Sequence, residues 1–209
     1  MDDIEKTVHW LGHSSFRLEG ADGKTVYIDP YKVSAPEKKA DVVLVTHAHS
    51  DHFSPADIEK VTGAATKIFG PVSLTGKVKG SFTALKPGER ADTAGIPIET
   101  VSAYNTDKSF HPKAAGNLGY IVTIGGLRVY HAGDTDVIEE MKDIKADVAL
   151  LPVGGNYTMD ASDACQAAKI LKPRAAVPMH YGSIVGSDED AIRFKNLCLC
   201  DVRVLARED

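Results

Sequence analysis

Short apolar runs separated by turn-forming residues recur along this chain and predict a protein rich in β-strands. The run over residues 42–45 is apolar at every position, which predicts a strand covered on both faces. Turn signals at residues 21–24 and at Gly125-Gly126 predict hairpins. The expected strands cover residues 8–11, 16–18, 25–28, 42–45, 66–69, 81–85, 96–101, 120–124, 127–130, 148–151 and 175–177.

Apolar residues at helical spacing predict helices between the later strands. One helix is expected over residues 160–172, ended by Pro173, and another over residues 188–198 after a Ser187 cap. A third begins after Ser54, because serine is a good N-cap and Pro55 suits the first helical position. Without any linker-like stretch, the pattern predicts one α/β domain of layered sheets over residues 1–209.

The composition excludes several classes of protein. A net charge of −5 argues against a general surface for polyanions. No run is long and apolar enough to span a bilayer, and the acidic N-terminus lacks the apolar core of a signal peptide, so a cytoplasmic location is expected. Cys165, Cys198 and Cys200 do not form a disulfide framework and are expected to be reduced structural thiols rather than a separate metal site.

The candidate chemistry is concentrated in His47-Ala48-His49-Ser50-Asp51-His52, directly after the apolar run at 42–45. Alternation along an extended segment puts His47 and His49 on the same side, so both rings can reach one metal ion. Asp51 and His52 can then serve a second ion beside the first. The alternative, a polar loop with ordinary surface histidines, fits such a dense cluster poorly, because histidine is the commonest metal ligand.

Two more ligand candidates follow predicted strands in the same way. Asp134 comes soon after the strand ending at Tyr130, and His180 comes soon after the strand at 175–177. Each alone would be an ordinary turn or structural residue. Ligands gathered on loops at one edge of a sheet are what a preformed metal pocket requires, so both are expected to join the His47 cluster.

Several motifs of this sequence resemble those of a known protein family. The His-x-His-x-Asp-His motif, the Ala-Gly-Asp-Thr stretch around Asp134 and the late His180 are similar to the metallo-β-lactamase superfamily. Further stretches resemble the branch of metal-dependent hydrolases similar to L-ascorbate-6-phosphate lactonase. These stretches are residues 10–16, 28–30, 130–136, 151–155 and 179–182. The resemblance runs over nearly the whole chain and is far more specific for the superfamily than for a substrate.

The resemblance implies a four-layer αββα sandwich with a two-metal site at one edge. By the same resemblance, His47 and His49 bind the first metal, Asp51, His52 and His180 bind the second, and Asp134 bridges the two. The family pattern also expects a third histidine on the first metal, at a position where this chain has Asn105.

Several residues near the expected site have two interpretations each. His111 is a candidate replacement for the missing ligand, or else a substrate contact, and Asn105 is placed to orient His111 or a water. His13 is expected to line the pocket, with metal ligation as the alternative. Tyr157 is a candidate hydrogen-bond donor to a substrate oxyanion, or else part of the turn before the helix at 160–172.

Two histidines are not expected to bind metal. His131 precedes the Gly133-Asp134 turn and is expected to play a supporting or core role, hydrogen-bonded to a carboxylate or carbonyl. His9 lies between Val8 and Trp10 on a predicted strand and is expected to be structural.

The ligand set predicts metal-assisted hydrolysis. Two divalent ions sharing a water would lower its pKa and hold a bridging hydroxide, with Asp51 accepting its proton. Zinc is the first expectation, with manganese, iron and nickel as alternatives. The substrate is expected to be a small ester, lactone or phosphoester, anionic in character, and formation of a homo-oligomer is left open.

Three alternatives remain open at this stage. A phosphodiesterase or nuclease would need a basic groove, for which Lys77, Lys79 and Lys86 give only a modest positive stretch, so nucleic acid is not the expected partner. A non-catalytic metal-binding protein of the same fold is motivated by Asn105. A mononuclear iron enzyme would have lost the ligands of the second metal, which are present.

Overall fold

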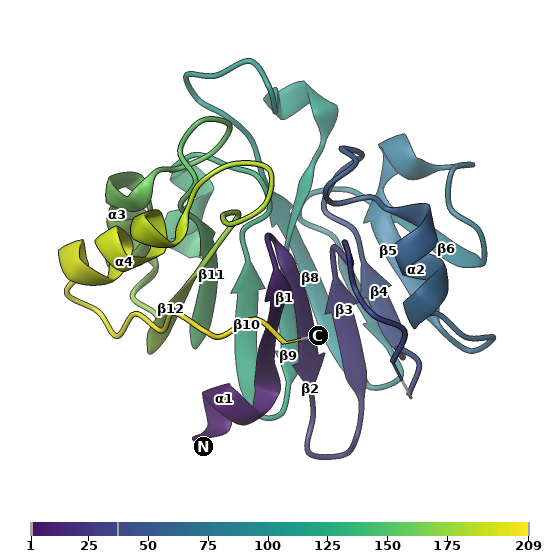
Figure 1. Cartoon of the computed structure of the whole chain (residues 1–209). Helices are drawn as coiled ribbons and strands as arrows, with labels where there is room; N and C mark the ends of the chain where they lie inside the picture. The colour runs from purple at the N-terminus through teal and green to yellow at the C-terminus, as the bar shows by residue number, and fades with distance from the viewer. Residues whose placement is uncertain (1, 37, 209) are drawn as a thin grey trace.

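The apolar runs form two six-stranded β-sheets that pack face to face, as shown by the computed structural model, which describes residues 2–36 and 38–208 (Figure 1). The first sheet has the order β1 (Val8–Gly12), β2 (Ser15–Glu19), β3 (Thr25–Ile28), β4 (Val42–Leu44), β5 (Lys67–Pro71), β6 (Ser81–Leu85). The second has the order β12 (Ala175–Met179), β11 (Val148–Pro152), β10 (Leu127–His131), β9 (Leu118–Ile124), β8 (Ile96–Ser102), β7 (Arg90–Thr93).

Each sheet has an antiparallel half and a parallel half. In the first, β1, β2 and β3 are antiparallel, and β3 to β6 are parallel, with Ile28 beside Leu44. In the second, β7 to β10 are antiparallel, and β10, β11 and β12 are parallel, with Leu150 between His131 and Val177. Parallel strands end at the same edge of a sheet, so the loops after β3, β4, β10 and β12 gather at one edge of the molecule.

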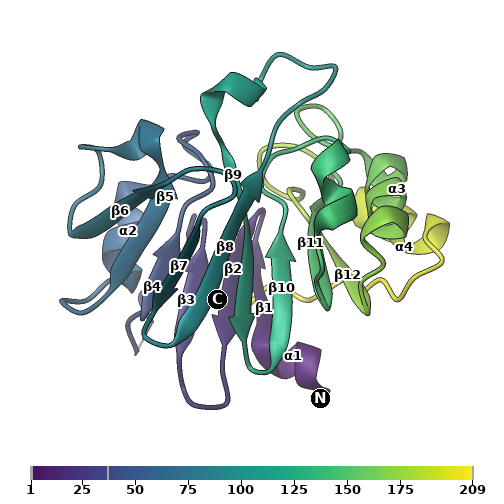
Figure 2. The ribbon, with the colours of Figure 1, turned by 180° about the vertical axis from the view of Figure 1, so that it is seen from behind.

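Helices cover the outer faces of both sheets. Figure 1 shows α2 (Pro55–Val61) over β4 and β5, and α3 (Ala161–Leu171) and α4 (Asp188–Leu197) beside β11 and β12. Figure 2 shows β7 to β10 of the second sheet from behind. The fold is therefore the predicted four-layer αββα sandwich. The shorter helical segments are α1 (Asp3–Thr7) and the 3-10 turns η1 (Val72–Leu74), η2 (Lys113–Ala115) and η3 (Glu139–Asp143).

Strand β4 packs against a different layer on each of its two faces. Val42 and Leu44 belong to the large apolar cluster between the sheets, whereas Val43 and Val45 belong to a smaller cluster beneath α2. All four side chains are buried, which confirms the prediction of a strand covered on both faces. Burying such side chains contributes roughly 1.5–3 kcal/mol each, so the loop that follows β4 is anchored on a stable element.

The predicted strands and the three predicted helices are all present, with small shifts at their ends. The sequence pattern missed α1, β7 and the three 3-10 segments. Strand β7 alternates between exposed and half-buried residues and has almost no apolar character, so its pairing with β8 decides its conformation. All three cysteines are free thiols, as predicted. Among the described residues, no helix combines the length and the apolar character needed to cross a membrane.

Candidate metal centre

Five segments from distant parts of the chain bring the predicted ligands together at one edge of the sandwich. His47, His49, Asp51 and His52 occupy the loop between β4 and α2. The remaining residues lie in four other segments: His13 between β1 and β2, Asn105 and His111 between β8 and η2, Asp134 after β10, and His180 after β12. Figure 1 shows the segment between β8 and β9, in teal, rising above this edge.

The first group of ligand atoms consists of three imidazoles. Nδ1 of His49 lies 3.1 Å from Nε2 of His47 and 3.2 Å from Nε2 of His111. Their ligand atoms all lie within 4.8 Å of one another. The structure therefore groups His111 with His47 and His49, and its role as a replacement ligand stays a prediction.

The second group consists of His52, His180, Asp51 and His13, whose ligand atoms also lie within 4.8 Å of one another. Asp51 Oδ2 lies 3.6 Å from Nε2 of His52 and 3.9 Å from Nε2 of His180. It lies closest to His13, at 2.9 Å from Nε2. His13 thus contacts the predicted second site directly, through a carboxylate that is itself a predicted ligand.

Asp134 lies between the two groups. Its Oδ2 is 3.3 Å from Nε2 of His111 and 3.1 Å from Nε2 of His180. Its Oδ1 is 3.2 Å from Nε2 of His52. The oxygens of this carboxylate thus face histidines of both groups, and its bridging role stays a prediction.

A buried carboxylate that the sequence analysis did not single out fixes two of these histidines. Asp29, directly after β3, accepts a hydrogen bond from Nδ1 of His52 at 2.6 Å and another from the Thr46 hydroxyl at 2.6 Å. The hydroxyl has donated its only proton, so it accepts from Nδ1 of His47 at 3.0 Å. Both rings therefore carry a proton on Nδ1. Nε2 of each ring then faces the centre, as is usual when a second hydrogen bond orients a metal-binding histidine.

Asn105 fixes His111 by the same logic. Its Nδ2 donates to the Tyr157 carbonyl at 3.0 Å, and its Oδ1 accepts from the His111 backbone N–H at 2.9 Å, so the amide orientation is determined. The same Oδ1 lies 3.1 Å from Nδ1 of His111, which must donate. Nε2 of His111 is left with its lone pair toward His49 and Asp134. Asn105, at the position where the family pattern expects a histidine, thus orients His111, six residues later in the chain.

The backbone around the centre is strained. Six of the described non-glycine residues have φ in the left-handed region, and three of them, His13, Asp29 and His180, lie at this centre, with φ values of 52°, 47° and 59°. Such residues persist only where surrounding contacts hold them, and they cluster at functional sites. Here the His180 N–H donates to the His13 carbonyl at 2.9 Å, which ties two of the strained residues together.

The charges of the centre suit a cation. Burial would raise the pKa of Asp134, but His180 and His52 outweigh it and hold the pKa well below its usual range. Burial opposes charge on His52, yet Asp134 and Asp29 raise its pKa well above the ordinary histidine value. Burial, and then the charge on His52, lower the pKa of His47 well below its usual range. The carboxylate is therefore ionised and His47 is neutral, the forms that bind metals, whereas His52 holds a second proton that a metal ion at its Nε2 would displace.

The residues fit a metal ion for a second reason. His52 Nε2 and Asp134 Oδ1 are buried 3.2 Å apart, and neither makes a well-oriented hydrogen bond to any of the described residues. Buried polar atoms are rarely left without a partner, so two such atoms pointing into one ligand cluster indicate a binding site for a cation.

The other sequence candidates lie outside the ligand groups. Nε2 of His131 lies 2.9 Å from the Ser14 carbonyl, which confirms its predicted carbonyl partner. His9 pairs with Glu208 on the first sheet. Tyr157 reaches the site through its backbone carbonyl, while its ring packs edge-on against Phe110 at 4.7 Å between centroids. Its predicted contact with a substrate oxyanion stays a prediction. The residues that sequence reasoning missed are Asp29 and Thr46, and the Asp29-Pro30 stop after a strand was the available signal.

Several known proteins are similar to this chain over nearly its whole length. Residues 7–180 match a model described as the β-lactamase superfamily domain. A UPF0173 metal-dependent hydrolase of Thermoplasma volcanium is 39% identical over 208 residues, covering 93% of this chain and 92% of that protein. The crystal structure of a Parabacteroides distasonis protein is 36% identical, with a TM-score of 0.82, covering 96% of this chain and 93% of that one. Igni18, a metallo hydrolase of Ignicoccus hospitalis, is 31% identical with a TM-score of 0.76, covering 97% and 95%.

Proposed function

This chain belongs to the metallo-β-lactamase superfamily of metal-dependent hydrolases, and we propose that it cleaves a small ester, lactone or phosphoester at a centre of two divalent ions. His47, His49 and His111 would hold the first ion, and Asp51, His52 and His180 the second, with Asp134 between them. The observation that carries the proposal is the fixed orientation of His47, His52 and His111, whose Nε2 atoms all face Asp134.

The bound ions supply Lewis acidity, which activates a water near neutral pH and polarises the substrate oxygen. The chain's own residues supply orientation and proton transfer. Asp51 is the accessible carboxylate of the centre, with 16% of its side chain exposed against 3% for Asp134. Burial would raise the pKa of Asp51, but the His13 hydrogen bond and the charge of His52 lower it, so Asp51 is ionised and can accept a proton.

His13 acts on this base as a positioning residue. Its ring is buried, and Nε2 lies 2.9 Å from Asp51 Oδ2. The Trp10 indole and the His180 backbone both donate to the His13 carbonyl, at 2.9 Å each, so the ring sits on a fixed backbone. A donor held on one oxygen of Asp51 leaves its other oxygen to receive the proton.

Imidazoles together with carboxylates suit zinc first and manganese second, while iron and nickel accept similar ligands. The likeness to the ascorbate-phosphate lactonase branch makes lactones the first substrates to examine. From the composition of the sequence we also propose a cytoplasmic location.

The test is metal content per chain, measured on protein purified without added metal, for the wild type and His111→Ala. We expect two ions in the wild type and about one in His111→Ala, because one of three imidazoles of the first group is lost. The loaded wild type is then assayed on neutral esters, phosphorylated lactones and phosphodiesters beside Asp51→Asn, which should lose at least about 100-fold in kcat when the two proteins are compared at measured metal content.

Three outcomes decide between the alternatives. Turnover of lactones or esters supports the proposal. Preference for phosphodiesters moves the chain to the phosphodiesterase alternative. Two bound ions without turnover of any substrate support a non-catalytic metal-binding protein, and fewer than one ion, unchanged in His111→Ala, rules out the two-metal centre.

A further inference from the structure

A second hollow lies beside the metal centre and shares His13 with it. The cavity has a volume of about 310 Å³. Its lining comes from the β1–β2 turn, the segment after β3, the loop after β12 and the C-terminal segment. The lining residues are Trp10, Leu11, Gly12, His13, Tyr31, Lys32, Tyr181, Gly182, Ser183 and Arg207.

The lining of this cavity has two cationic side chains, Lys32 and Arg207, and no carboxylate. Within residues 2–36 and 38–208, neither cation is within ion-pair distance of a carboxylate, which distinguishes Arg207 from most other arginines of the chain. The molecule as a whole carries a net charge of −5, so two unpaired cations lining one hollow are not explained by overall composition. The hollow therefore has a local field that favours an anion.

Neutral contacts hold both cations at the cavity. Lys32 Nζ donates to the Ser183 hydroxyl at 3.3 Å and lies 5.0 Å from the centre of the Tyr31 ring. The Arg207 guanidinium donates to the Lys32 carbonyl at 3.3 Å. Each cation thus keeps most of its hydrogen-bond donors and its full charge for a ligand.

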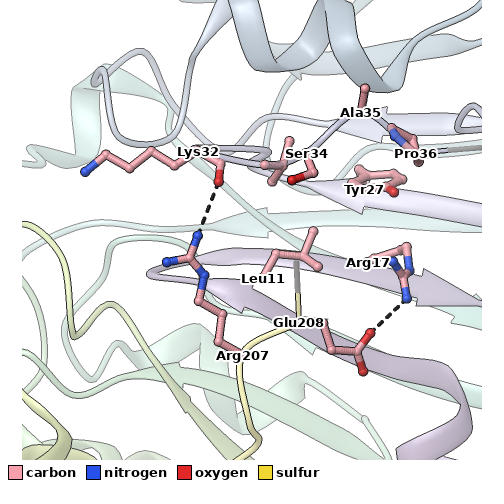
Figure 3. A pocket seen from close by; sticks show the side chains of 10 residues that line it. Leu11, Arg17, Tyr27, Lys32, Ser34, Ala35, Pro36, Arg207 and Glu208 are labelled. Carbon is pink, nitrogen blue, oxygen red and sulfur yellow. Dashed lines mark hydrogen bonds and ion pairs between the residues drawn. The ribbon is translucent and has the colours of Figure 1, made fainter.

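The adjoining smaller cavity, of about 80 Å³, provides a contrast (Figure 3). It also borders Lys32 and Arg207, but its other arginine, Arg17, donates to Glu208 at 2.9 Å. Figure 3 shows the Lys32 amino group extending away from this smaller cavity. The unpaired charge of Lys32 is therefore available to the larger hollow rather than to the smaller one.

The floor of the larger cavity connects it with the metal centre. Trp10 and Tyr181 stack at 4.7 Å between ring centroids, and the Trp10 indole donates to the His13 carbonyl. The Tyr31 ring meets the His13 ring edge-on at 6.2 Å. His13 in turn contacts Asp51 at 2.9 Å, so a molecule bound in the hollow is separated from the reacting groups by a single side chain.

We infer that this cavity is the subsite for an anionic group of the substrate, a carboxylate or a phosphate that lies away from the bond being cleaved. The inference rests on the proposed hydrolase function and assigns Lys32 and Arg207 as residues that determine specificity. Both side chains are exposed at the rim, so they select the substrate by charge and take no part in the proton transfer at Asp51.

The test compares wild type with the double variant Lys32→Met/Arg207→Gln, and with Lys195→Met/Arg193→Gln as a control that removes the same charges from the exposed face of α4. Each protein, loaded with zinc, is assayed on p-nitrophenyl acetate and on mono-p-nitrophenyl glutarate, which adds a distal carboxylate. Calorimetric titration with glutarate and with methyl phosphate then reports anion binding without turnover. Metal content and the unfolding midpoint verify that all three proteins are equally loaded and folded.

We expect the Lys32→Met/Arg207→Gln variant to lose about tenfold or more in kcat/KM for the glutarate ester, mainly through KM, because each lost ion pair weakens binding several-fold. The acetate ester and the control variant should change by less than about twofold. Weaker binding of glutarate alone identifies a carboxylate subsite, whereas weaker binding of methyl phosphate identifies a phosphate subsite.

Equal losses on both esters, or no loss on the glutarate ester together with unchanged anion binding, overturn the subsite. If neither ester is cleaved but anion binding still depends on Lys32 and Arg207, the subsite stands and the proposed ester hydrolysis fails.

Discussion

Asp29 is not a metal ligand in the proposed centre, but its hydrogen bonds orient two of the histidines that are. Its carboxylate is fully buried and accepts hydrogen bonds from the Thr46 backbone, the Thr46 hydroxyl and His52. Through them it sets the tautomers of His47 and His52, one ring in each ligand group. A single carboxylate thus orients one histidine in each ligand group of the proposed centre, independently of a bound ion.

Replacing Asp29 tests this arrangement. Asp29→Asn keeps the shape but removes the acceptor that fixes Nδ1–H on His52, so we expect metal affinity to fall about 10–100-fold. Competition with a chromophoric chelator measures the affinity. Asp41→Asn is the matched control, because Asp41 accepts a backbone hydrogen bond from Thr25 away from the ligands. Unchanged affinity in Asp29→Asn would mean that the histidines keep their orientation without it.

Asn105 and His111 should behave as one unit. Asn105→Ala removes the acceptor that orients the His111 ring, so it should lower the occupancy of the first ion nearly as much as His111→Ala. The double variant should then be no worse than His111→Ala, because the two residues act through a single ligand. Metal content of the three variants at one zinc concentration checks this. Additive losses would show that Asn105 contributes independently.

At the scale of elements, the turn after β10 delivers the bridging carboxylate. Gly133 has φ 65°, and a Cβ there would lie 2.7 Å from the Leu118 carbonyl, so the chain passes close to β9 before reaching Asp134. Gly126, in the hairpin turn between β9 and β10, has φ 79° but open space around it. The two glycines share a conformation and differ in what surrounds them.

We therefore expect different results from alanine at these two glycines. Gly126→Ala should cost about 1 kcal/mol of unfolding free energy from the unfavourable φ, with full metal content. Gly133→Ala should cost about 1–3 kcal/mol of unfolding free energy from the unfavourable φ. It should also lower the metal content, because the clash with the Leu118 carbonyl displaces Asp134. Urea unfolding and metal analysis separate the two effects. Full metal content in Gly133→Ala would show that the turn can shift without moving the carboxylate.

At the scale of the whole molecule, the proposed centre joins the two sheets. His47, His49, Asp51 and His52 follow β4 of the first sheet, whereas Asp134 and His180 follow strands of the second. An ion held by residues from both sheets binds only the folded state, so it stabilises the sandwich by mass action. The apolar cluster shared by the sheets supports the proposal that residues 1–209 form a single domain.

Removing the metal should therefore lower thermal stability. Zinc at about 1,000 times its dissociation constant would contribute roughly 4 kcal/mol, a shift of several degrees in the unfolding midpoint that a chelator reverses. Differential scanning calorimetry with zinc, and with chelator followed by added zinc, measures the shift. Asp134→Ala, which loses the carboxylate between the two groups, should show little of this zinc dependence. An equal shift in that variant would place the ion elsewhere.

The sequence by itself determined the local features of this protein. Apolar periodicity fixed the main strands and helices, since burial of alternating or helical faces is a local pattern, and the His47–His52 cluster is contiguous in the chain. The tertiary structure alone decided how the remaining side chains meet. It brought His111 to His49, placed Asp29 behind His47 and His52, and set Lys32 and Arg207 beside one cavity. These contacts join residues far apart in the sequence, and they depend on which strand ends share an edge, which no local pattern of hydrophobic and polar residues encodes.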